Sequence, residues 1–459
     1  MKRLALLLSL VIVAACGPVA SLSPSAAPLP TAAAATSAPR ASATASPSAV
    51  PSPTTVAAGM IREVRADLVR TGAGDPGGSG AQAVAAADAA FGLRLYRELA
   101  TRKGNLIYSP YSISTALSMT YGGAGGTTAQ QLAAALGVGA DPTAWHAGRN
   151  DIDSFLERPQ AVDPDSGVTP LTIEPTNALF GQDGFGFQPA YLELLARDYG
   201  AGLQAVDFMA DSEAARGAIN RWVAARTKDR IRELLAPATV SEATRFVLVN
   251  AIYFKGSWAY QFDKKATKSA AFRRLDGTSV NVPMMHGTFA GDYVRGDGWQ
   301  AVDIPYLGAT MTVILPDAGR FETVESQVDA AFLAKLKTHP AFDFVHLGLP
   351  RWSSSTDVDL VENLQKLGVR DLFDPGAADL RGIADARLYV SQVIHQATIT
   401  VDEHGTEAAA ATAVVGDTSG GGPDGEVSVT VDRPFLYVIR DGGTGEIMFA
   451  GRVTDPTLH

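Results

Sequence analysis

The sequence predicts an α+β fold, in which helices and a mixed sheet follow one another without regular βαβ alternation. Two observations support this. Residues 82–136 carry apolar side chains at helical spacing, whereas residues 244–254, 309–315 and 344–349 are short apolar runs typical of buried strands. Near its end the chain has a further pair of predicted strands, within residues 434–453, joined by a glycine-rich turn.

Local chemistry predicts the first helices. Residues 82–100 repeat apolar side chains at intervals of four. Ser109 suits an N-cap, with Pro110 at the first helical position of the next helix. The GGAGG run should stop that helix, and Thr127 with Gln130 predicts a capping box for a third.

A longer helix leads into the most apolar strand of the chain. Residues 219–235 have an amphipathic pattern, and residues 244–254, TRFVLVNAIYF, form a nearly unbroken apolar run that suits a strand buried on both faces. Asn250 interrupts this run. A buried carboxamide without partners costs about 1–3 kcal/mol, so the fold must bring polar groups to it.

The first residues predict export and lipid attachment. Lys2 and Arg3 precede the apolar run Leu4 to Val13, which is too short to span a bilayer, and the segment closes on Val-Ala-Ala-Cys at Cys16. It resembles bacterial lipoprotein signals, in which the cysteine becomes the lipid-modified N-terminus. An ordinary signal peptide that happens to end in cysteine is the alternative. The resemblance implies a protein tethered to the outside of a bacterial cell surface or envelope, through a membrane anchor at Cys16.

Composition divides the chain into four parts. Residues 1–15 are the predicted signal, residues 16–59 an Ala/Ser/Pro/Thr-rich flexible tether, residues 60–82 a poorly defined extension, and residues 83–459 the folded domain. Its length alone would favour two domains, since cores tend to split beyond about 250–300 residues, but no second linker divides it.

Charge and motifs exclude several classes of function. The formal net charge of −10 and the lack of a basic run argue against nucleic acid or an anionic membrane surface as a partner. Cys16 is the only cysteine, so no internal disulfide or CxxC metal site is available. The chain contains no HExxH, GxSxG or Walker-type phosphate loop. We therefore expect no enzyme and no cofactor.

Six segments, in order, resemble the serpin family of serine protease inhibitors, and the resemblance covers about residues 83–456. They are residues 105–132 (NLIYSPYSISTALSMTYGGAGGTTAQQL), 171–208, 219–231, 248–258 (LVNAIYFKGSW), 395–412 (HQATITVDEHGTEAAAAT) and 429–456. The resemblance implies a serpin fold, with helices around a large central sheet A, further sheets B and C, and an exposed reactive-centre loop. It also implies a monomer.

The alanine run after the predicted strand of residues 387–401 matches the serpin hinge, which is formed by Glu403, Gly405, Thr406, Glu407, Ala408, Ala409, Ala410, Ala411 and Thr412. In inhibitory serpins this segment enters the main sheet as a new strand after a protease cuts the loop. Alternate side chains must then be small, and Thr406, Ala408, Ala410 and Thr412 are the expected inward set. An alanine-rich loop or helix without this role is the alternative.

Two further clusters carry over from the family. The shutter, beneath the point where the sheet opens, is matched by Ser109, Ser112, Asn250 and His395. The breach, where insertion begins, is matched by Trp258, Arg351 and Glu403. Arg351 stands where the family usually has lysine, which keeps the charge and adds donors for Glu403. As a surface pair the two would contribute about 0–1 kcal/mol.

The loop predicts the class of target. Counting from the hinge glycine places the cleaved bond between Ser419 and Gly420, with residues 415–422 all left open because the loop is longer than usual. No lysine or arginine lies between residues 407 and 432, which disfavours a trypsin-like target. Elastase-like or subtilisin-like serine proteases suit these small residues, and Asp417 leaves an aspartate-directed protease as an alternative.

The resemblance therefore implies a suicide inhibitor that traps a serine protease as a covalent acyl-enzyme. A non-inhibitory serpin, acting as a binding or carrier protein, is the alternative. A surface-tethered binding lipoprotein of another fold would have two lobes and a cleft, against which the continuous order of the motifs argues.

Overall fold

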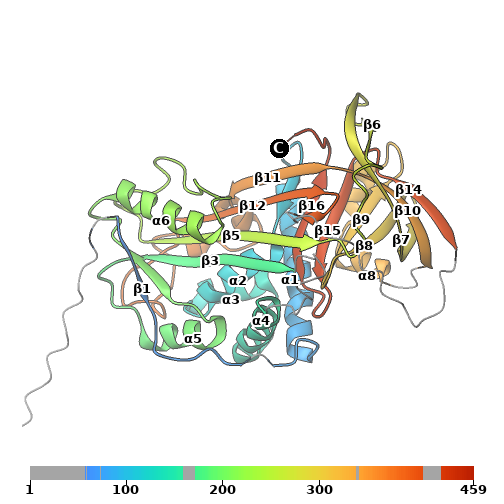
Figure 1. Ribbon diagram of the computed structural model, residues 1–459. Helices are drawn as coiled ribbons and strands as arrows, with labels where there is room; N and C mark the ends of the chain where they lie inside the picture. Colours follow the sequence, from blue (N-terminus) through green and yellow to red (C-terminus); the bar gives the residue numbers. More distant parts are fainter. Residues whose placement is uncertain are drawn as a thin grey trace, which may run out of the picture. The chain divides into compact units, whose positions relative to one another are not determined.

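The apolar run around Asn250 forms strand β5 (Phe246–Ser257), near the centre of a seven-stranded sheet that we call sheet A (Figure 1). The computed structural model describes residues 57, 59–72, 74–158, 171–337, 341–406 and 425–458. Within these ranges the strand order is β1-β4-β3-β5-β13-β12-β11. The other strands of sheet A are β1 (Ile61–Val64), β3 (Thr172–Gln182), β4 (Leu203–Val206), β11 (Trp352–Asp359), β12 (Gln392–Asp402) and β13 (Gly405–Thr406).

Sheet A is buried on both faces, as the sequence of β5 predicts. Phe246, Leu248 and Ile252 belong to the large core that also holds the side chains of the N-terminal helices. Val247 and Val249 face the other way, into a smaller core beneath helix α6 (Ser212–Arg226). Burying such side chains stabilises the fold by roughly 1.5–3 kcal/mol each.

Among the helices of the first half, α2 and α6 pack directly on strands of sheet A (Figure 1). Ser109 caps α2 as predicted: its hydroxyl accepts the N–H of Ser112, and Pro110 occupies the first turn. Helix α1 crosses α2 closely at Gly92, where a Cβ atom would lie 2.5 Å from the Pro110 side chain. The helices of the described residues are α1 (Ser79–Leu99), α2 (Pro110–Tyr121), α3 (Gly126–Leu136), α4 (Pro142–Leu156), α5 (Pro189–Tyr199), α6, α7 (Phe321–Gln327), α8 (Ala330–Leu336) and α9 (Val361–Lys366).

Two local predictions about helices are wrong. The capping box of Thr127 and Gln130 does not form, because α3 already begins at Gly126 and its N-cap, Gly125, is held by a backbone bond to Asp379. The helix predicted over residues 219–235 ends at Arg226. Beyond it the backbone turns through positive φ at residues 228 and 229, which a right-handed helix does not allow.

The second sheet is continuous across what the resemblance predicts as sheets B and C. The 18-residue strand β7 (Ser279–Gly296) joins the two parts, in the order β14-β10-β7-β8-β9-β15-β16-β2, with β6 also paired to β7. The predicted C-terminal strand pair is confirmed as β15 (Phe435–Asp441) and β16 (Ile447–Val453). The remaining strands are β2 (Leu106–Tyr108), β6 (Lys268–Arg273), β8 (Trp299–Pro305), β9 (Ala309–Pro316), β10 (Ala341–Pro350) and β14 (Glu426–Thr430).

The described residues lack both a membrane-spanning helix and a metal-binding cluster. None of their helices is both long and apolar enough to cross a bilayer. The same residues contain no group of three or more His, Cys, Asp or Glu side chains placed to hold a metal ion.

Candidate functional site in sheet A

The predicted shutter residues meet where β5 pairs with β12. Asn250 and His395 are direct cross-strand partners, and His395 Nδ1 lies 2.5 Å from Asn250 Oδ1. The other ring nitrogen, Nε2, lies 3.2 Å from the backbone nitrogen of Ser109 and accepts its N–H. Because Nε2 is an acceptor, Nδ1 carries the ring proton and donates it to Asn250.

Burial holds His395 in its neutral form. The side chain is fully buried, and desolvation lowers its pKa to about 3. It has no carboxylate partner among its hydrogen bonds. The imidazole therefore ties β12 to β5 and to the start of α2 as a neutral hydrogen-bonding group, and not as a catalytic base.

Asn177 completes the shutter and was missed by sequence reasoning. Its Oδ1 atom accepts hydrogen bonds from the Ser112 hydroxyl, at 2.6 Å, and from Asn250 Nδ2, at 2.7 Å. These bonds supply the partner that the buried carboxamide of Asn250 requires. The available signal was a polar residue directly before the apolar run 178–181, but its pairing with Asn250 depends on the register of β3 on β5.

The predicted breach residues meet at the other end of β12. The indole N–H of Trp258 donates to the backbone carbonyl of Asp402 at 2.9 Å, and its ring stacks on Tyr306 with centroids 4.1 Å apart. Glu403 Oε1 accepts from two nitrogens of Arg351 and from the Thr267 hydroxyl.

The Arg351–Glu403 pair is not the surface pair that the sequence predicts. The Glu403 side chain is only 1% exposed, whereas that of Arg351 is 41% exposed. Burial alone would raise the pKa of Glu403, but the hydrogen bonds from Arg351 and Thr267 outweigh it, so the pKa is lowered. A buried carboxylate with one partly exposed cation is worth more than a surface pair, because loss of the cation strands the charge.

The first hinge residues already lie inside sheet A. Gly405 and Thr406 form β13, which pairs with Asp402 and Val401 of β12 on one side and with Ser257 and Gly256 of β5 on the other.

The position of β13 between β5 and β12 depends on glycine at residue 405 and on the hydroxyl of Thr406. Gly405 has φ of +141°, and a Cβ atom there would lie 2.1 Å from the carbonyl oxygen of Gly256. Thr406 is buried, and its hydroxyl lies 2.7 Å from that of Tyr306. The Thr406 side chain therefore points into the core, and its role in insertion stays a prediction.

Several predicted positions lie outside the described residues. They are Cys16, the rest of the hinge (Glu407, Ala408, Ala409, Ala410, Ala411 and Thr412) and the reactive bond between Ser419 and Gly420. The chain is described again from Gly425, and β14 follows, paired in parallel with β10. The roles of these residues stay predictions.

Comparison with known proteins decides the family. The family model for Serpin (serine protease inhibitor) matches residues 86–456. The chain belongs to the serpin family. Leukocyte elastase inhibitor of Homo sapiens is 35% identical to this serpin over 389 residues, which cover 81% of this chain and 99% of that protein.

Solved serpin structures share the fold. Uncleaved ovalbumin is 28% identical, with a TM-score of 0.73, and the match covers 82% of this chain and 100% of ovalbumin. Thyroxine-binding globulin, in its complex with thyroxine, is 29% identical, with a TM-score of 0.72, over 82% of this serpin and 99% of the globulin. The fold therefore serves protease inhibition in one similar protein and small-molecule binding in another.

Proposed function

We propose that this serpin is a suicide inhibitor of extracellular serine proteases of the elastase-like or subtilisin-like class. The target's serine attacks the carbonyl of a loop bond near Ser419, forming an ester and releasing the new amino terminus at Gly420. The freed hinge then inserts into sheet A and carries the attached protease with it. A displacement of the catalytic groups by about 1 Å is enough to slow deacylation a hundredfold.

The observation that carries this proposal is the register of β13. If the chain continues from Thr406 in the same antiparallel register, Ala408 and Ala410 follow it on the inward face, and Thr412 reaches the level of Asn250 on β5 and His395 on β12. Those two residues are already opposite each other. The small side chains of the hinge thus align with the paired stretch of β5 and β12 that must separate for insertion.

Insertion would replace one parallel pairing, between β5 and β12, with two antiparallel pairings. At present β5 and β12 pair in parallel over Val247–Ile252 and Gln392–Ala397. A strand entering between them would run antiparallel to both, as β13 already does. Parallel pairing is slightly less stable per residue than antiparallel pairing, and each ladder adds backbone hydrogen bonds, so insertion is favourable once the loop is cut.

The proposal extends to where the protein acts. We infer that Cys16 carries a lipid and that the preceding signal is removed, so that the inhibitor is tethered to a membrane and faces outward. Palmitate labelling of the wild-type chain, compared with Cys16→Ser, tests this independently of inhibition. Equal labelling of the two proteins would contradict it.

The test of inhibition uses the protein expressed from residue 53 onward, which forms one structural unit. Incubation with an elastase-like protease should give a complex that survives denaturing electrophoresis, whereas the same protease with its active-site serine replaced by alanine should give none. Cleavage without a complex, at every ratio of inhibitor to protease, would overturn the proposal.

A binding or carrier function is the second candidate, favoured by the similarity to thyroxine-binding globulin. In that case cleavage would yield no covalent complex. A large rise in heat stability on cleavage would then indicate loop insertion without trapping. If cleavage left the heat stability unchanged, loop insertion itself would be refuted.

A further inference from the structure

Strand β6 forms an outer edge of the second sheet, and within the described residues only β7 pairs with it (Figure 1). Across the turn that joins the two strands, the backbone N–H of Arg274 donates to the carbonyl of Thr278. Because every second residue of an antiparallel strand bonds to its partner, the even-numbered residues of β6 are those that bond to β7. The backbone N–H and C=O groups of Ser269 and Ala271 therefore point away from β7.

The outer side of β6 is open to a further segment of chain. At its end the backbone N–H of Arg273 donates to the carbonyl of Asp432 at 2.8 Å, so one outward group of β6 already bonds to a neighbouring segment. Ser269 and Ala271 are small and exposed, whereas Phe272 on the opposite face is buried in the core. An extended chain can approach the backbone here without displacing a large side chain. Such an edge is a template for pairing with another strand.

Positive charge surrounds this edge. Residues 264–274, KKATKSAAFRR, hold five cations and no acid in a chain whose formal net charge is −10, and six neutral residues lie among them. Four of the cations are exposed and form no ion pair in the described part of the chain: Lys264, Lys265, Lys268 and Arg273. The fifth, Arg274, pairs with Asp455 at 2.5 Å. Two neighbouring acids, Asp263 and Asp276, accept backbone N–H groups of their own turns.

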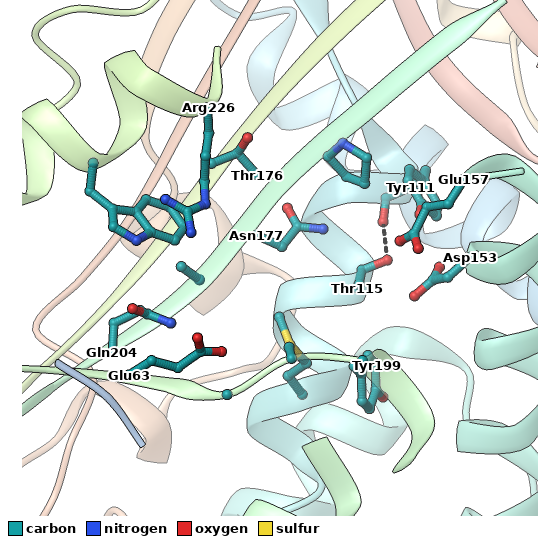
Figure 2. Close-up of a pocket in the computed structure, with 17 residues that line it drawn as sticks. Glu63, Tyr111, Thr115, Asp153, Glu157, Thr176, Asn177, Tyr199, Gln204 and Arg226 are labelled. Carbon is teal, nitrogen blue, oxygen red and sulfur yellow. Dashed lines mark hydrogen bonds between the residues drawn. The ribbon is translucent and has the colours of Figure 1, made fainter. Parts of the chain in front are cut away.

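The acids of the cavity beside the shutter are, by contrast, paired within the chain (Figure 2). This cavity has a volume of about 250 Å³, and Asp153 and Glu157 lie together at one end of it. Arg70 lies 3.7 Å from the carboxylate of Asp153 and hydrogen-bonds that of Glu157 at 2.6 Å. The unpaired charges around β6 are therefore the stronger evidence for a partner outside the chain.

We propose that the outer edge of β6 binds an extended acidic segment of another protein as an added strand. The outward backbone groups of β6 pair with the segment, and its carboxylates lie against Lys268 and Arg273 at the two ends of the strand. A nucleic acid or a polysaccharide would use the cations but not the alternating donors and acceptors of the edge. The same cations repel the β6 edge of a second copy, so they select an acidic partner.

The segment that leads into β6 also borders the breach. Thr267 directly precedes β6, and its hydroxyl donates to the carboxylate of Glu403. The backbone N–H of Phe262 donates to the carbonyl of the same residue at 3.0 Å. A protein bound along β6 is therefore held beside the start of the hinge. The binding itself does not depend on inhibition, and its test needs no protease.

Fluorescence anisotropy tests the recognition of charge. The probe is a labelled peptide of about eight alternating glutamate and valine residues, added to the protein from residue 53 onward. We expect saturable binding that weakens as the salt concentration rises. Binding should be at least tenfold weaker when Lys268→Glu and Arg273→Glu are combined, and unchanged in Arg97→Gln, which alters an exposed cation on α1. Circular dichroism checks that each variant is folded.

A second set of measurements tests the added strand. Ala271→Pro removes one outward N–H and leaves the bonds between β6 and β7 in place, because proline is tolerated where the N–H of an edge strand faces outward. This variant should bind the peptide at least tenfold more weakly. The same peptide with a methyl group on every backbone nitrogen keeps its charge but cannot donate, and it should bind as weakly. Amide hydrogen exchange at Ser269 and Ala271 should slow when the unmodified peptide binds.

Four results would overturn the proposal. Equal affinity for a peptide with lysine in place of glutamate would exclude recognition of acidic groups. Full affinity of the methylated peptide, or of Ala271→Pro, would show that the cations attract the peptide without strand addition. Binding of dextran sulfate without binding of the peptide would assign the cations to a polyanion. A dimer in sedimentation that Ala271→Pro abolishes would show that the edge pairs with a second copy of the chain.

Discussion

If the proposed inhibitory function holds, Thr406→Arg is expected to give a protein that the protease cleaves without being trapped. Thr406 is 1% exposed, and its hydroxyl is the hydrogen-bond partner of the buried Tyr306 hydroxyl at 2.7 Å. Stranding that hydroxyl costs about 1–3 kcal/mol, and burying an unpaired guanidinium costs at least as much again. A total of about 2–6 kcal/mol, if felt in the step that begins insertion, slows it by about thirtyfold or more.

Slower insertion gives the protease time to complete hydrolysis. The assay is the number of inhibitor molecules consumed for each protease inactivated, with electrophoresis to separate covalent complex from cleaved product. Glu407→Arg is the matched control, because the same side chain one residue later should point outward and leave trapping near the wild-type level. Equal trapping by Thr406→Arg and the wild type would refute the inward role of Thr406 and, with it, the insertion register.

Three further predictions concern the shutter and the breach. Asn177→Ala should lower the free energy of unfolding, measured in urea, by about 2–4 kcal/mol, because two buried donors lose their acceptor. Asn177→Asp keeps the accepting oxygen and should lower the free energy of unfolding by less. His395 has a pKa of about 3 when folded and 6.5 when unfolded, so as the pH falls the unfolded state binds the proton first. The contribution of neutral His395 to the free energy of unfolding, up to roughly 5 kcal/mol, should therefore be complete above pH 6.5 and fall as the pH drops toward 3. Urea midpoints measured from pH 7 to 4 should fall less steeply in His395→Asn than in the wild type. Arg351→Ala should lower the free energy of unfolding by about 1–2 kcal/mol, after allowance for the exposure of Arg351, and this loss should appear as a lower melting temperature. Arg351→Lys should lower the melting temperature less. Equal melting temperatures for the two variants would show that Glu403 needs no cation.

Much of the fold follows from local pattern. The uninterrupted apolar run around Asn250 predicts a strand buried on both faces, and its side chains do alternate between two cores. The same reasoning predicts that Asn250 must have polar partners, which it finds in Asn177 and His395. Ser109 with Pro110 predicts the start of α2 because capping depends on neighbouring residues alone.

Tertiary register decides what local pattern does not. Asn177 joins the shutter only because β3 and β5 pair so that two asparagines face each other. Glu403 is buried because Trp258 and Thr267 surround the end of β12, and nothing in its neighbouring sequence signals burial. The extra strand β1 likewise exists because β4 offers it an edge, which a short polar sequence cannot foretell.

The first two hinge residues of β13 already lie inside sheet A, whereas β5 and β12 still pair with each other further along. This combination affects when insertion can proceed. Thr406 lies between β5 and β12, yet six residues further down the register Asn250 and His395 still bond directly to each other. Their bond belongs to a network that also includes Asn177, and through Ser109 and Ser112 it reaches α2. Advance of the hinge must therefore separate three strands and a helix together, which makes opening cooperative. On the proposed mechanism, the hinge replaces those bonds when the cut loop brings Thr412 to the level of Asn250 and His395.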